Sequence, residues 1–203
     1  ICISLTRRQR LLQELSNVLK WNYLPDTVSN HGDLEKFIYF KRKWINYSYN
    51  SLESKEKNSL LFDLSYSEGA FIAKEDLKST FLQIRAPYKM PVFVLDKENL
   101  MSSFYGLSGL QDIDFKEHPD FSKRFFLSGE DKKGIRSFFT DDLIFFFESH
   151  PLYYIESKGD SLLIRGKERL ASIQEIKQML AFAEQLIKLL KGKKLKNSFN
   201  SSP

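Results

Sequence analysis

Residues 172–190, SIQEIKQMLAFAEQLIKLL, constrain the fold more than any other stretch of this sequence. Ser172 and Glu175 have the spacing of a capping box, in which each side chain accepts a hydrogen bond from the other residue's backbone N–H at the start of a helix. Apolar side chains then recur at helical spacing from Ile173 to Leu190. This pattern predicts one long helix whose apolar stripe must be buried, and we expect it to pack on a β-sheet. Gly192 is expected to end the helix.

The sheet itself is indicated by aromatic and β-branched runs bounded by turn-forming residues. The alternation in 59–67 indicates a half-buried strand, and the apolar runs on either side of Gly159 indicate a hairpin. Helical spacing or helix-start signals recur at 6–20, 130–139 and 140–150. The strands are expected at 37–50, 59–67, 79–86, 90–98, 123–129 and on both sides of 158–160.

These elements predict a single α+β domain. We expect an antiparallel sheet of about six to eight strands, with an N-terminal helix, short helices in the middle and the long C-terminal helix packed on the sheet. The expected organisation is an N-terminal juxtamembrane segment and helix over 1–35, the α+β domain over 36–191, and a disordered basic tail over 192–203. The segment 98–107 is expected to form a short helix or an irregular turn.

Charge and cysteine content restrict the function. The net charge is +5, but it comes from the ends of the chain: the five lysines from Lys188 onward and the arginines Arg7, Arg8 and Arg10 account for more than the whole excess. Nucleic-acid binders usually place positive charge on a folded face, so a nucleic-acid partner is not expected. The single cysteine, Cys2, excludes an internal disulfide and a CxxC metal or redox site.

The chain opens with ICISLTRRQR and has no initiator methionine. An apolar stub followed at once by three arginines is typical of the cytoplasmic end of a transmembrane helix. We therefore expect a fragment of a longer, membrane-anchored protein, in which Arg7, Arg8 and Arg10 contact the membrane surface. The alternative is a frayed N-terminus that precedes an ordinary helix.

Residues 112–125, DIDFKEHPDFSKRF, crowd four carboxylates and a histidine into a short span. One hypothesis is a metal or acid–base site formed by the acids and His118. The other is a strand, a turn at His118–Pro119 and a second strand, because Asp112 and Asp114 alternate with apolar residues as they would on the wet side of a sheet. We favour the second hypothesis, and we expect no metal site and no catalytic residue.

Other motifs give little support to an enzyme. The histidines, His31, His118 and His150, have no zinc-site spacing, and the sequence contains neither a GxSxG elbow nor a phosphate-binding loop. Arg136 is a weak candidate for anion binding, although an ion pair to a nearby acid is the simpler expectation. The basic triplet 41–43 could contact phosphates beside Trp44, or it could protect an exposed sheet edge.

Several stretches in this order resemble an uncharacterised family of bacterial membrane proteins. They are LLFDLSYSEG, STFLQI, MPVFVLDKENL, the run from DIDFKEHPDF to LIFFFE, and IESKGDSLLI. The resemblance covers about residues 36–190 and implies two N-terminal transmembrane helices followed by a soluble domain. This chain lacks those helices, and the family implies no known activity.

We therefore expect a non-enzymatic domain on the cytoplasmic side of a membrane, acting as a protein-interaction or sensing module without a cofactor and with a protein partner that the sequence does not identify. One alternative is a module that binds a small ligand or lipid in a pocket between sheet and helix. The other is a metal-dependent enzyme that uses the 112–120 carboxylates.

Overall fold

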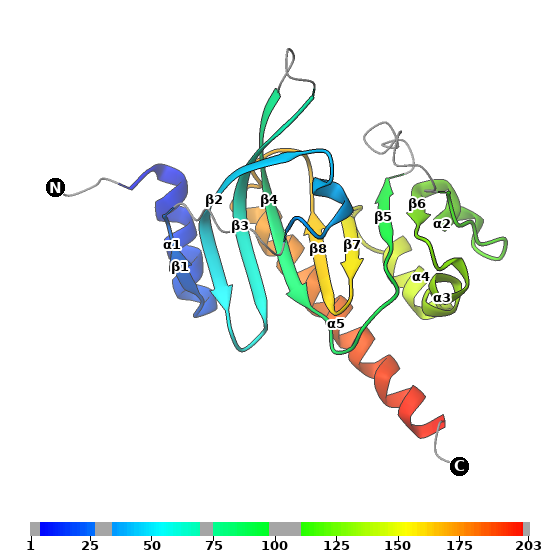
Figure 1. The fold of residues 1–203 in the computed structure, drawn as a ribbon. Coiled ribbons are helices and arrows are strands. Elements are labelled where there is room, and N and C mark those ends of the chain that lie inside the picture. The colour runs from blue at the N-terminus through cyan, green and yellow to red at the C-terminus, as the bar shows by residue number, and fades with distance from the viewer. Residues whose placement is uncertain (1–4, 27–33, 70–74, 98–110, 201–203) are drawn as a thin grey trace. The chain divides into compact units, whose positions relative to one another are not determined.

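The computed structural model describes residues 5–26, 34–69, 75–97 and 111–200, with the side chains of 193–200 left out. Within these ranges the chain forms an eight-stranded antiparallel sheet and helices, so the α+β prediction is confirmed (Figure 1). The strand order is β1-β2-β3-β4-β8-β7-β5-β6. The predicted segment 98–107, Cys2 and His31 lie outside the described residues.

The chain divides into two compact units. The first unit combines residues 1–85 with 165–180, and the second combines 86–164 with 181–203. The first contains β1 (Asn22–Leu24), β2 (Trp44–Ser54), β3 (Ser59–Glu68) and β4 (Glu75–Arg85). The second contains β5 (Val94–Lys97), β6 (Phe125–Ser128), β7 (Tyr154–Lys158) and nearly all of β8 (Ser161–Arg165).

In the first unit, α1 (Arg7–Leu19) begins at a capping box in which Thr6 and Gln9 bond each other's backbone N–H. It ends at Lys20, which adopts the left-handed conformation that often closes a helix. Leu12 and Leu15 are buried. The helix therefore packs through one apolar stripe, as its sequence spacing predicted.

The prediction of one long strand over 37–50 is wrong in its first half. Residues Ile38–Phe40 form a 3-10 helix (η1), and β2 begins only at Trp44. The rings of Tyr39 and Phe40 lie 5.6 and 5.4 Å from the ring of Phe81 on β4, centroid to centroid. Tertiary packing of the aromatic rings has thus overridden the local preference of these residues for a strand.

In the second unit, β5 pairs antiparallel with both β6 and β7. The predicted hairpin is confirmed: β7 and β8 flank a turn in which Gly159 has φ of +65°. Three short helices, α2 (Pro119–Arg124), α3 (Lys132–Phe138) and α4 (Asp141–Glu148), supply a cluster of phenylalanine rings. Asp131 caps α3 by accepting a hydrogen bond from the Gly134 N–H, as the acids in this stretch predicted.

The long C-terminal helix, α5 (Ile173–Asn200), is confirmed and starts as predicted. The Ser172 N–H donates to the Glu175 carboxylate at 2.9 Å, and the Glu175 N–H donates to the Ser172 hydroxyl at 3.2 Å. The prediction that Gly192 ends the helix is wrong, because α5 continues to Asn200, into the segment expected to be a disordered tail. A glycine costs a helix interior only about 1 kcal/mol, which its neighbours can offset.

Candidate functional site

The acidic segment 112–120 does not form the strand that the sequence suggested, although its apolar residues are buried as expected. Ile113 and Phe115 are buried, while residues 111–115 have no assigned strand. The Asp112 carboxylate accepts hydrogen bonds from the backbone N–H groups of Ile113 at 2.8 Å and Leu127, on β6, at 3.0 Å. The Asp112 carboxylate therefore accepts from the β6 backbone a hydrogen bond that a neighbouring strand would otherwise accept.

Burial raises the pKa of Asp112 above its ordinary value, and the two backbone donors oppose that shift in part. The two backbone contacts tie the acidic segment to β6. The other acids of the segment, Asp114, Glu117 and Asp120, are exposed. Asp120 lies in the first turn of α2 instead of in the predicted turn.

The His118 side chain contacts a carboxylate outside this segment, that of Asp141. Its Nε2 lies 3.1 Å from the exposed Asp141 carboxylate, and its ring meets that of Phe145 edge-on at 5.2 Å. These contacts join α2 to α4 within the second unit. Among the described residues, no group of three or more His, Cys, Asp or Glu side chains is arranged to hold a metal ion.

Arg136, the weak anion-binding candidate, is exposed on α3. Its guanidinium donates to the Asp114 carbonyl oxygen and lies 5.4 Å from the centre of the Phe115 ring. It thus fastens α3 to the acidic segment through a backbone carbonyl and a cation–π contact. Anion binding by this residue stays a prediction.

A small cavity in the second unit is lined only by apolar side chains. They are Met90, Phe93, Phe138, Leu143, Phe147, Ile155, Leu162, Leu186 and Leu190. The space open to solvent-sized molecules is about 10 Å³. That is at the lower limit for one water molecule, and a buried water also needs polar groups to bond, which this apolar lining does not supply. This cavity is therefore a packing defect in a core, too small for a ligand.

The three N-terminal arginines are separated by the turn of α1. Arg8 faces inward, and its Nε and Nη2 atoms each donate to an oxygen of Asp63 on β3 at 2.7 Å. Its Nη1 donates to the Ala171 carbonyl at 2.7 Å. The Arg8 side chain is 23% exposed and that of Asp63 is 1% exposed. The guanidinium of Arg8 is thus fully engaged by acceptors within the first unit.

Asp63 is the centre of a polar network that the sequence pattern did not reveal. Besides Arg8, its carboxylate accepts from the Asn50 amide at 2.9 Å and the Thr80 hydroxyl at 2.7 Å. The Tyr23 hydroxyl in turn donates to the Asn50 amide oxygen at 3.1 Å. The alternation in 59–67 predicted a half-buried strand, but all of β3 from Leu61 to Ser67 is buried. The missed signal was an arginine on the buried stripe of an amphipathic helix.

The charge of Asp63 affects two phenol groups, those of Tyr23 and Tyr49. Burial, reinforced by the charge of Asp63, raises the pKa of Tyr23 and of Tyr49 to about 12. The charge of Arg8 opposes this rise in pKa for both groups. The two tyrosines are therefore neutral at physiological pH, and the network is a charge-balanced pair surrounded by neutral donors.

Arg7 and Arg10 face the other way. Both are exposed, and neither side chain has a hydrogen-bond or ion-pair partner within the described part of the chain. No acid stands in the first turn of α1. Two cations thus lie near the positive end of a helix macrodipole, where charge of this sign is disfavoured by roughly 0.3–1 kcal/mol each.

The residues of the basic triplet 41–43 also differ in exposure. Lys41 and Arg42 are exposed, but the Lys43 side chain is only 7% exposed and forms an ion pair with Glu68. The Lys43 ammonium lies 4.6 Å from the centre of the Tyr39 ring. The Tyr39 hydroxyl lies 2.9 Å from that of Tyr66, and burial raises the pKa of both phenols. This second cluster is closed by its own contacts and packs η1 onto the sheet.

No helix among the described residues is both long enough and apolar enough to cross a membrane. Comparisons of the chain with protein-family models, with curated proteins and with solved structures found no match. The resemblance to a bacterial membrane-protein family therefore stays a prediction, and so does the membrane contact of Arg7 and Arg10, which are both exposed.

Proposed function

We propose that this chain is a non-enzymatic interaction or sensing module on the cytoplasmic side of a membrane, and that Arg7 and Arg10 contact its anionic headgroups. The observation that supports the proposal is the exposure of two arginines at the start of α1, neither of which contacts an acid or an acceptor in the part of the chain that the structure describes. Arg8 is not part of this contact, because Asp63 already holds its guanidinium.

The energetics favour an external anion. At the N-terminus of a helix an arginine lowers stability slightly, so the pair contributes nothing to the fold that would explain its place there. A headgroup layer contributes about 1 kcal/mol for each arginine or lysine that lies near it. Two arginines therefore supply about 2 kcal/mol, a factor of roughly 30 in partitioning. Such a contact orients a tethered domain but does not anchor it alone.

The proposal is tested by cosedimentation of the chain with vesicles. Binding should rise with the fraction of phosphatidylserine and fall with salt, because the attraction is electrostatic and is screened over about 10 Å at 0.1 M ionic strength. The double variant Arg7→Glu/Arg10→Glu should lose this binding.

The matched control is Lys55→Glu/Lys57→Glu, which makes the same change in charge at exposed positions in the turn between β2 and β3. This control should retain the binding. If both double variants lost vesicle binding equally, net charge alone would explain the effect. If vesicle binding did not depend on the phosphatidylserine content, the proposed contact with anionic headgroups would be wrong.

A further inference from the structure

We infer that the aromatic residues at the start of β2, Trp44 and Tyr47, form a second part of the membrane contact and insert at the headgroup level of the bilayer. This inference rests on the proposed function, because it extends the contact made by Arg7 and Arg10. We call Trp44 and Tyr47 together the aromatic end of β2.

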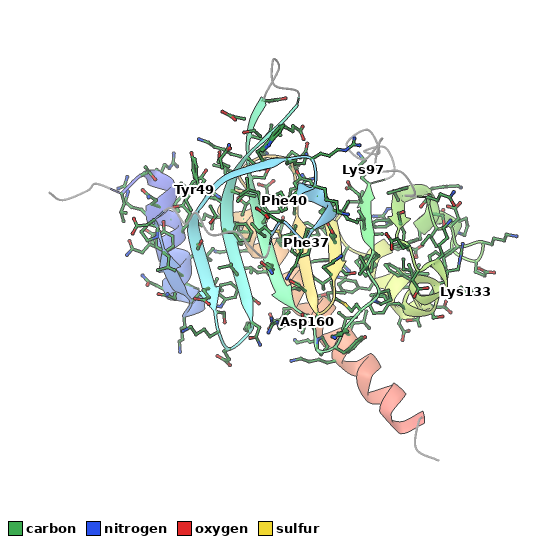
Figure 2. The ribbon with its side chains drawn as sticks, in the orientation of Figure 1. Phe37, Phe40, Tyr49, Lys97, Lys133 and Asp160 are labelled. Carbon is green, nitrogen blue, oxygen red and sulfur yellow. The ribbon has the colours of Figure 1, made fainter. Side chains whose placement is uncertain are left out.

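The register of the sheet places the aromatic end of β2 on the face that α1 covers. Tyr49 is paired with Asp63, Tyr47 with Ser65 and Trp44 with Ser67. Alternate residues of a strand share a face, so Tyr47 and Trp44 lie on the same face as Asp63, which Arg8 of α1 contacts. Figure 2 shows Tyr49 on β2 beside α1, in agreement with the effect of the Arg8 charge on that phenol.

A β-bulge makes this arrangement possible. Trp44 and Tyr47 are three residues apart, a spacing that would put them on opposite faces of a regular strand. The register shift between Ile45 and Tyr47 adds one residue and returns both rings to one face. The Asn46 amide donates to the Ser67 hydroxyl at 2.9 Å, which holds the bulge in place.

The aromatic end of β2 extends along the sheet beyond the level of Asp63. One pair of residues advances a strand by about 6.6 Å, so Tyr47 and Trp44 lie one and two such steps beyond the level of Asp63. Arg7 and Arg10 stand in the first turns of α1, on either side of the residue that reaches Asp63. The arginines and the two rings thus belong to elements of the same unit, α1 and β2, and Figure 1 shows the first half of β2 curving away from α1 toward η1.

The exposure of the two rings suits a lipid interface. Trp44 is 53% exposed and Tyr47 is 37% exposed, although both are large and partly apolar. Tryptophan and tyrosine concentrate at membrane–water boundaries, where the ring meets acyl chains and the polar group stays hydrated. Lys41 and Arg42, which are also exposed, precede Trp44 and add positive charge beside it.

The charges favour a lipid surface over a single-stranded nucleic acid. Aromatic rings can stack on bases, but such sites also line the backbone path with positive charge. Here Asp76 lies on β4 next to Ser67, on the same face as Trp44, and Glu75 precedes it. A nucleic-acid backbone that crossed the strands would place its phosphates beside these acids. A layer of lipid headgroups would contact only the outermost side chains.

The test uses tryptophan fluorescence with vesicles that contain phosphatidylserine and brominated phosphatidylcholine, because bromine quenches tryptophan within the bilayer. The chain has two tryptophans, Trp21 and Trp44. The native chain, Trp44→Phe and Trp21→Phe are compared after cosedimentation has fixed the bound fraction of each. Quenching should persist in Trp21→Phe and be lost in Trp44→Phe, with a blue shift of the Trp44 emission on binding.

A second pair of variants tests the energetic role. Trp44→Ser/Tyr47→Ser should weaken vesicle binding, and Phe145→Ser should not, although Phe145 is 58% exposed in the second unit. If the native chain cosediments but Trp44 is not quenched, this inference is overturned while the arginine contact stands. If the native chain does not cosediment with anionic vesicles, both fail. Quenching of Trp44 by a single-stranded oligonucleotide, without quenching by vesicles, would assign the surface to nucleic acid instead.

Discussion

Substitution of Arg8 by alanine is the sharpest test of the division among the three arginines. The Asp63 side chain is 1% exposed in the native chain, and the change removes its only charged partner within the described residues. Breaking a buried ion pair from one side costs about 3–5 kcal/mol, because the remaining charge is buried without compensation. Asp63 keeps two of its four donors, from Asn50 and Thr80, so we expect a value near 3 kcal/mol.

The assay is urea unfolding followed by tryptophan fluorescence. Trp21 and Trp44 both lie in the first unit, so the signal reports the unfolding of the part that contains the network. Arg7→Ala and Arg10→Ala are the controls, and each should leave the free energy of unfolding unchanged or raise it by at most about 1 kcal/mol, because it removes a cation from the positive end of α1.

A double-mutant cycle completes the experiment. In the background Asp63→Asn the buried charge is gone, so Arg8→Ala should cost much less than it does in the native chain. The reasoning would be refuted if Arg8→Ala were as mild as Arg7→Ala, or if the cost of Arg8→Ala were the same in both backgrounds.

Three further predictions concern single residues. The contacts of Glu175 with Arg169 and with the Ser172 N–H lower its pKa to about 2, from an ordinary value of 4.5. Its stabilising contribution is therefore present above pH 4.5 and lost as the pH falls toward 2; Glu175→Ala should cost about 1 kcal/mol near neutral pH, and acid titration of stability against Glu175→Gln shows the window. Asp112→Ala should cost about 1–3 kcal/mol in denaturant unfolding, because it leaves the Leu127 N–H of β6 without its acceptor. Since the folded pKa of Asp112 is raised, stability relative to Asp112→Asn should be greatest below the ordinary value of 3.8 and decline as the pH rises through the folded pKa. Gly159→Ala meets no atom within 4 Å but must adopt φ of +65°, so it should cost about 1–2 kcal/mol, and a stability equal to that of the native chain would show that the turn changes conformation.

The elements that could be predicted from the sequence are those set by neighbours along the chain. The capping box of Ser172 and Glu175 and the Gly159 hairpin depend on residues a few positions apart, and both are present. The 3-10 turn at Ile38–Phe40 depends on rings from β3 and β4, which local spacing does not reveal. The same holds for the first unit, which takes residues 165–180 from the far end of the chain.

For the candidate site, the sequence predicted a group of positive charges near the N-terminus but not the direction in which each side chain points. Three arginines near the N-terminus indicated a basic contact, but the inward turn of Arg8 depends on an aspartate 55 residues away. The alternation in 59–67 predicted a strand with one buried face, but both faces of β3 are covered from Leu61 to Ser67, and Asp63 lies among these residues. Among the acids of 112–120, Asp112 accepts hydrogen bonds from the backbone of Ile113 and of Leu127 on β6, and the second of these contacts depends on the position of a strand, which local spacing does not reveal.

The most direct test of the account is the partition coefficient of the chain and of Arg7→Gln/Arg10→Gln between buffer and phosphatidylserine vesicles at low salt. The account predicts that the native chain binds roughly 30-fold more strongly than the variant, which corresponds to about 2 kcal/mol from two arginines. On neutral phosphatidylcholine vesicles the two proteins should bind alike. Equal binding of the two proteins to the phosphatidylserine vesicles would contradict the assignment of these arginines to a membrane surface.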